Sequence, residues 1–157
     1  AKYGPSTVGL TIINSQYETP SPELVQAVQN AVDPPDKAGE GVGIAPIDHF
    51  VTVEPVKEFT IDVTLNITYQ NGYTWPDVEN AVLATIDDYF KELAREWAQA
   101  RTYEEDHTGL VVRISQIESR LLNVPGILDV SDTELNGQKS NIVLDKEEIP
   151  KRGVVVG

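Results

Sequence analysis

The chain has 157 residues, no cysteine and a formal net charge of −13, from 25 acidic and 12 basic residues. Without cysteine it has no disulfides, no thiolate metal ligands and no thiol nucleophile. The excess of negative charge opposes nonspecific binding to nucleic acids and anionic membranes, which depends on lysine and arginine. No apolar run approaches the roughly 20 residues that cross a bilayer. We therefore expect neither nucleic acid nor membrane as a partner, and the absence of methionine suggests part of a longer protein.

Residues 1–58 predict a small unit of strand, helix and strand. The apolar residues 7–13 (TVGLTII) predict a largely buried first strand. Ser21 followed by Pro22 predicts a helix start, because a serine side chain caps backbone N–H groups and proline fits the first helical position. The sequence DPP at residues 33–35 predicts the end of that helix, since proline cannot continue it.

Residues 59–69 (FTIDVTLNITY) alternate strictly between apolar and polar side chains. Successive side chains of a strand point to opposite faces, so this stretch predicts a long strand with one buried face. We expect Phe59 and Ile61 to be buried, and Asp62 and Thr64 to be more exposed. A break at residues 55–58 separates this strand from a shorter one, so we predict that the long strand joins two units.

The best-defined helix is predicted for residues 75–97. Thr74 and Asp77 have the spacing of a capping box, and apolar residues then recur at helical intervals. The opposite face is rich in charged residues, so the helix is amphipathic and is expected to cover the apolar face of the long strand.

The last part of the chain predicts short alternating elements. Residues 110–114 predict a strand, and the sequence SQIE at residues 115–118 predicts a capping box that opens a helix ending at Leu122. Ile127–Leu135 predicts another strand, and the following Asn-Gly dipeptide predicts a hairpin that leads to a return strand at residues 141–144.

Together these elements predict an α+β protein made of two small α/β units joined by the long strand. We place the first unit at residues 1–58, with a glycine-rich loop at residues 36–48, and the second at residues 59–157. The second unit is predicted to be a ferredoxin-like sandwich of the β-α-β-β-α-β type.

We find no catalytic, cofactor or metal motif. The sequence GEGVG at residues 39–43 follows a helix and precedes a strand, whereas a dinucleotide fingerprint follows a strand and opens a helix. The two histidines, His49 and His107, lack the spacing of a metal site. We therefore expect no enzyme, although a small-molecule-binding or regulatory module, or a cell-wall hydrolase with two facing carboxylates, stays open.

Two surfaces are candidates for contacts with other proteins. One is the glycine-rich loop, where glycine permits close approach of another chain, and the other is the acidic face of the long helix. The candidate interface residues are Gly39, Glu40, Gly41, Val42 and Gly43 in the loop, and Asp87 and Glu92 on the helix.

Six short motifs in a fixed order resemble the C-terminal part of the baseplate J-like family of contractile phage tails. They are residues 3–8 (YGPSTV), 22–29 (PELVQAVQ) with 33–34, 41–46 (GVGIAP) with 51–53, 113–118 (RISQIE), 124–127 (VPGI) with 129–130, and 148–150 (EIP) with Gly153. The resemblance spans almost the whole chain and is greatest to the versions in tail-like prophage elements of Gram-positive bacteria.

The resemblance implies a structural role. Members of this family are wedge components of the baseplate, associate with each other and with other wedge proteins, and have no catalytic residues in their pattern. It therefore implies an oligomeric, non-enzymatic protein without a cofactor, located in the tail baseplate of a phage or phage-like particle and assembled in the bacterial cytoplasm.

Overall fold

The computed structural model describes residues 6–100 and 109–157. Helices and strands both contribute to it, so the protein is α+β, as the sequence predicts. The contacts within the chain divide it into two compact units, unit 1 at Ala1–Lys57 and unit 2 at Glu58–Gly157.

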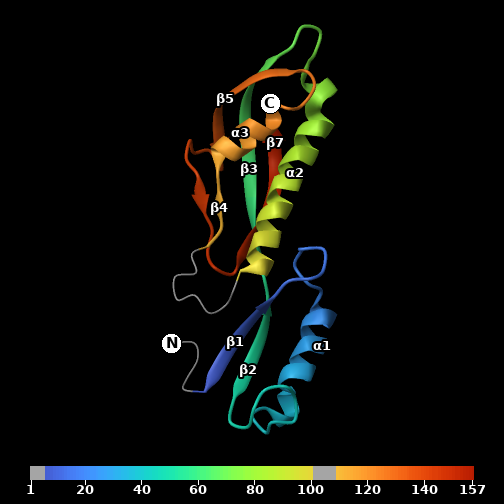
Figure 1. Cartoon of the computed structure of the whole chain (residues 1–157), viewed down its shortest axis with the longest axis vertical. Helices are drawn as coiled ribbons and strands as arrows, with labels where there is room; N and C mark the ends of the chain where they lie inside the picture. The colour runs from blue at the N-terminus through green and yellow to red at the C-terminus, as the bar shows by residue number, and fades with distance from the viewer. Residues whose placement is uncertain (1–5, 101–108) are drawn as a thin grey trace. The chain divides into compact units, whose positions relative to one another are not determined.

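Unit 1 consists of a strand, a helix and a second strand that runs parallel to the first. Strand β1 (Thr7–Ile12) pairs with β2 (Phe50–Pro55), and helix α1 (Pro22–Val32) and a 3₁₀ turn η1 (Pro35–Lys37) lie between them in the sequence. Parallel strands require a crossover connection, which α1 provides here (Figure 1).

Helix α1 begins and ends where the sequence predicts. The Ser21 hydroxyl oxygen accepts a hydrogen bond of 3.2 Å from the backbone N–H of Leu24, which caps the first turn. The helix ends at Val32, directly before the Asp-Pro-Pro sequence. None of its side chains is fully buried, so unit 1 has a small apolar core.

The described part of unit 2 contains five strands and two helices. The elements are β3 (Lys57–Tyr69), α2 (Trp75–Gln99), β4 (Val111–Val112), α3 (Ile114–Leu121), β5 (Ile127–Leu135), β6 (Ile142–Val143) and β7 (Glu148–Val156). Strands β5, β3 and β7 form one sheet in that order, with β3 at its centre, and β4 pairs with β6 in a second, two-stranded sheet.

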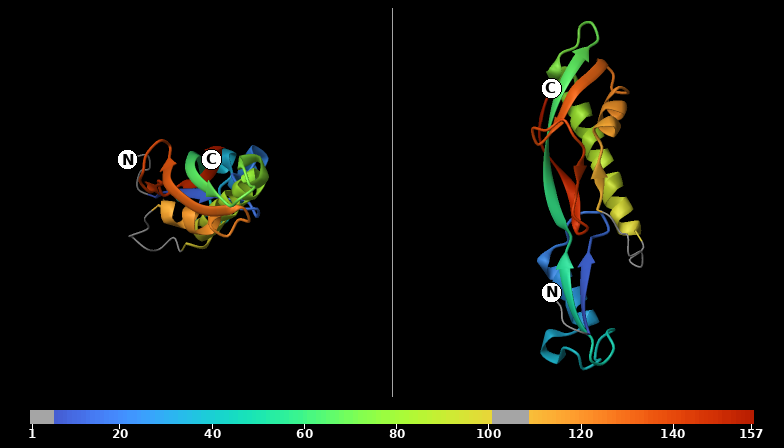
Figure 2. Two further views of the ribbon diagram at one scale, coloured as in Figure 1. Left: turned by 90° about the horizontal axis from the view of Figure 1, so that it is seen from above. Right: turned by 90° about the vertical axis from the view of Figure 1, so that its left-hand side faces the viewer.

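The alternation along β3 is confirmed. Ile61, Val63 and Leu65 are buried, Asp62 and Thr64 are exposed, and Phe59 is half-buried at the start of the strand. The buried side chains join those of α2, α3 and β5 in one core, with the helices on one face of the sheet (Figure 2). Burial of this face explains why β3 carries an apolar residue at every second position.

Two local predictions are wrong. Strand β6 does not return along β5 but pairs with β4, with Val111 opposite Val143. Helix α3 begins at Ile114 with Arg113 as its N-cap, so the predicted capping box at residues 115–118 does not open it. The described strands of unit 2 divide into sheets of three and two strands, and the predicted ferredoxin-like arrangement is not confirmed.

Candidate functional site

The glycine-rich loop of unit 1 is held in place by the carboxylate of Asp33. Asp33 is only 4% exposed, and its two oxygens accept hydrogen bonds of 3.0 Å from the backbone N–H groups of Gly39 and Val51. The first bond fixes the start of the loop and the second fixes the strand that follows it. One buried side chain at the end of α1 thus connects the helix, the loop and β2.

Three of the predicted interface residues have structural reasons to be glycine. Gly39 and Gly41 have φ angles of 78° and 70°, in the left-handed region that favours glycine. A Cβ atom on Gly43 would contact the backbone carbonyl oxygen of Val32, so the loop passes against the end of α1. The conformation of the loop therefore explains these three glycines without any contact with another protein.

The same loop and the first residue of β2 expose large apolar side chains. The exposed fractions are 58% for Val42, 79% for Ile44, 67% for Ile47 and 47% for Phe50. We call these four residues the apolar loop surface. Single exposed apolar residues are ordinary, whereas exposed apolar residues that form one contiguous patch are typical of a protein contact surface. The candidate Glu40 is also exposed beside them.

The two acidic candidates on α2 are already paired within unit 2. A carboxylate oxygen of Asp87 lies 2.7 Å from Nε of Arg152 on β7, and one of Glu92 lies 2.7 Å from Nη2 of Arg120 on α3. Because their partners belong to different elements, the structure does not bring these acids together as one acidic patch. Their carboxylates are half-exposed, with 50% and 52% of each side chain accessible.

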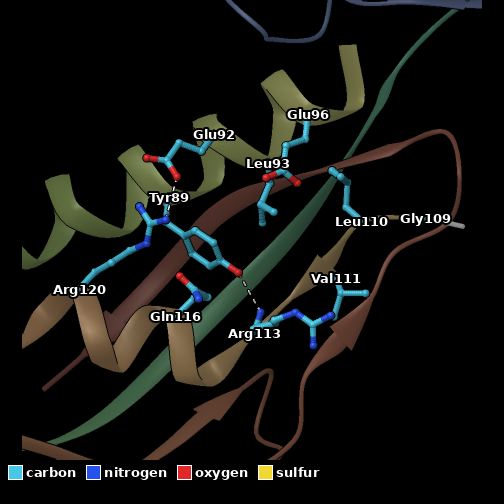
Figure 3. A pocket seen from close by; sticks show the side chains of 10 residues that line it. All are labelled: Tyr89, Glu92, Leu93, Glu96, Gly109, Leu110, Val111, Arg113, Gln116 and Arg120. Atoms are coloured by element: carbon cyan, nitrogen blue, oxygen red, sulfur yellow. Dashed lines mark hydrogen bonds and ion pairs between the residues drawn. The ribbon is translucent and has the colours of Figure 1, made fainter. Parts of the chain in front are cut away.

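A polar pocket of about 510 Å³ lies beside the Glu92–Arg120 pair (Figure 3). Its described walls come from α2, β4, α3 and the residues next to them: Tyr89, Glu92, Leu93, Glu96, Gly109, Leu110, Val111, Arg113, Gln116 and Arg120. Sequence reasoning missed this pocket, because its residues are spread over three elements and form no motif.

Three polar side chains of this pocket, those of Tyr89, Glu92 and Arg120, interact with groups of its own walls. The Tyr89 hydroxyl accepts a hydrogen bond of 3.0 Å from the backbone N–H of Arg113, and the guanidinium of Arg120 lies 4.7 Å from the centre of the Tyr89 ring. The hydrogen bond from Arg120 lowers the pKa of Glu92, and the same bond raises the pKa of Arg120. This arrangement fastens α3 to α2 and differs from the mostly apolar sites that bind small molecules.

Other acidic and histidine residues form no metal site in the described part of the chain. His49 is exposed, and its Nδ1 lies 3.1 Å from the backbone oxygen of Ile47. No group of three or more potential ligands occurs among residues 6–100 and 109–157. The other histidine, His107, lies outside the described residues. Among the described residues, no helix is long and apolar enough to cross a membrane.

Two domain profiles of one protein family match the chain in sequence. The baseplate J-like central domain matches residues 1–55, and the baseplate J-like protein C-terminal domain matches residues 61–157. The chain belongs to the baseplate J-like family. This confirms the resemblance in the six motifs and supports a structural role in a phage tail baseplate.

Two curated proteins of Bacillus subtilis (strain 168) are similar to this baseplate J-like chain. One is the phage-like element PBSX protein XkdT and the other is the uncharacterized protein YqbT. Each is 31% identical to it over 152 residues, which cover 97% of this chain and 40% of the relative. The chain therefore spans about two fifths of the length of these relatives.

Proposed function

We propose that this chain is a non-enzymatic structural part of the wedges in a contractile tail baseplate, where it binds other wedge proteins and copies of itself. The observation that carries the proposal is the match of both units to consecutive domains of one baseplate family. The similar XkdT protein belongs, by its name, to a phage-like element, which favours a particle of that kind. Such a baseplate would be assembled in the bacterial cytoplasm.

The surface of unit 1 supports a role in protein contacts. The apolar loop surface offers four exposed apolar side chains, three on the loop and one at the start of β2, and Asp33 binds the backbone of both segments. A pre-organised loop loses little conformational freedom on binding, which favours association. We therefore propose that this loop contacts a neighbouring baseplate protein.

Removal of the gene from cells that produce the particle tests this role. We expect particles without complete baseplates, and we expect the unchanged gene to restore them in electron micrographs. A gene carrying Ile44→Asp and Ile47→Asp should fail to restore them, because charges would replace two exposed apolar contacts. Val143→Asp is the matched control, since Val143 is 69% exposed on β6 of the other unit.

Complete baseplates in the absence of the gene would contradict the proposed function. Normal baseplates with the double aspartate variant would contradict only the role of the loop. Soluble expression and circular dichroism of each variant would show that a loss of baseplates does not follow from misfolding.

A further inference from the structure

The apolar loop surface has an apolar centre on one short segment of the glycine-rich loop. The Phe50 ring lies against Gly39 and the Ile47 side chain lies against Gly41, since a Cβ atom at either glycine would contact them. Val42 follows Gly41 directly in the chain. The exposed side chains of Phe50, Ile47 and Val42 therefore gather on the same segment.

Acidic residues border this centre. Glu40 lies between the two glycines, and the backbone N–H of Asp48 donates to the carbonyl oxygen of the first glycine over 2.8 Å. Both acidic residues are exposed, and none of the ion pairs among the described residues involves them. Asp36 is exposed as well, and Lys37 is the one basic residue in the loop at 36–48, apart from no histidine. The rim of the surface thus carries a net negative charge.

A second copy of this chain fits this surface poorly. If two copies met through it, their acidic rims would face each other and repel. A copy also offers little positive surface elsewhere, because the chain has 25 acidic and only 12 basic residues. Four of the basic residues are already paired with acids of the same chain, namely Arg120, Lys139, Lys151 and Arg152. The acidic rim therefore favours a partner of opposite charge.

We propose that the apolar loop surface binds a different protein, at a site with an apolar centre and a rim of lysine or arginine side chains. Protein interfaces commonly combine an apolar core with a polar rim, and complementary charges favour the correct partner and speed association. The inference deepens the proposed function and rests on it, because it names the chemistry of the neighbour that this loop contacts. Copies of the chain associate through another surface.

Photo-crosslinking in assembled particles identifies the occupant directly. The gene is expressed with benzoylphenylalanine in place of Val42, which is 58% exposed, and, as a control, in place of Val143, which is 69% exposed in unit 2. We expect position 42 alone to crosslink to a segment of another protein that carries lysine or arginine beside apolar residues. A crosslink to this gene product or to a segment without basic residues, the same crosslink at both positions, or no crosslink at position 42 would overturn the proposal.

A change of the rim charge tests the electrostatic part. Glu40→Lys combined with Asp48→Asn replaces two negative charges by one positive charge, and asparagine tolerates the φ angle of 64° at Asp48. We expect about tenfold fewer complete baseplates than with the unchanged gene, since the new charge repels a basic rim. Glu147→Lys combined with Asp129→Asn makes the same change of charge at exposed residues of unit 2 and should restore baseplates fully.

The outcomes separate this inference from the proposed function. Full restoration by the rim variant, when removal of the gene abolishes baseplates, would overturn only the chemistry of the partner. A crosslink from position 42 to a basic site on a protein outside the tail would contradict only the proposed function. If the rim variant fails to fold in circular dichroism, the crosslink still decides between the expected partner and the alternatives.

Discussion

Replacement of Asp33 by alanine is expected to destabilise unit 1 strongly, because its carboxylate is buried and binds two segments of the unit. The carboxylate accepts hydrogen bonds from Gly39 and Val51, and alanine would leave both N–H groups without their partner. A buried donor without a partner costs about 1–3 kcal/mol. Gly39 is buried, whereas Val51 is half-buried, so in the variant water can partly replace the hydrogen bond lost at the N–H of Val51. We therefore expect a loss of about 2–4 kcal/mol, a large share of the stability of a small domain.

Urea denaturation followed by NMR measures this loss for each unit separately. The midpoint for backbone signals of unit 1 should fall in Asp33→Ala, and hydrogen exchange at Gly39 and Val51 should accelerate. Asp33→Asn keeps one acceptor oxygen and should lose about half as much. Asp36→Ala is the control, since Asp36 is exposed on η1 and its removal should change the free energy of unfolding by about 0.5 kcal/mol at most. A loss in Asp33→Ala no larger than in this control would refute the reasoning.

Three further predictions concern unit 2. Gly126→Ala should lower the thermal stability of unit 2 more than Gly72→Ala does. Both glycines have positive φ angles, but only at Gly126 would the new Cβ contact the Tyr73 ring. Equal losses in the two variants would show that backbone strain alone determines the effect. Ile86→Ala, at a side chain that is 1% exposed in the core, should lower the free energy of unfolding by about 2–5 kcal/mol, whereas Val154→Ala at a 66% exposed site should change it little. The pKa of Glu92, measured by carboxylate NMR titration, should lie below that of an ordinary glutamate and rise in Arg120→Gln, because the hydrogen bond from Arg120 lowers it. The stabilisation by this pair is present above the pKa of Glu92 in the unfolded chain and is lost as pH falls through the lower pKa of the folded state, and an unchanged pKa in Arg120→Gln would contradict this.

The elements that could be predicted are those whose signals are local. The alternation from Phe59 to Tyr69 follows directly from burial of one face of β3. The ends of α1 follow from Ser21 and from the Asp-Pro-Pro sequence, both within one turn of the helix. Such signals need no knowledge of distant parts of the chain.

The elements that were predicted wrongly depend on residues far away in the sequence. Helix α3 begins at Ile114 because the side chain of Asn141 accepts a hydrogen bond of 2.9 Å from its N–H, which no local capping pattern reveals. Strand β6 lies along β4 partly because the N–H of Leu144 donates to the carbonyl oxygen of Leu110 over 2.8 Å. The Asn-Gly turn after β5 produces only a single bridge between Leu135 and Gln138.

In the candidate site, too, local features could be predicted from the sequence and contacts between distant residues could not. The exposure of the loop residues Glu40 and Val42 can be predicted from the sequence, since a glycine-rich loop lies at the surface. The pairing of Asp87 with Arg152 cannot be predicted in this way, because 65 residues separate them in the sequence. The role of Asp33 was hidden as well: the sequence predicts a helix end there but not that its carboxylate binds two segments of unit 1.

Electron microscopy of purified tail particles, labelled with an antibody against this chain, tests the central claim most directly. The account predicts label at the end of the tail that carries the baseplate, in repeated copies around the tube. Label confined to the head or along the sheath would contradict it.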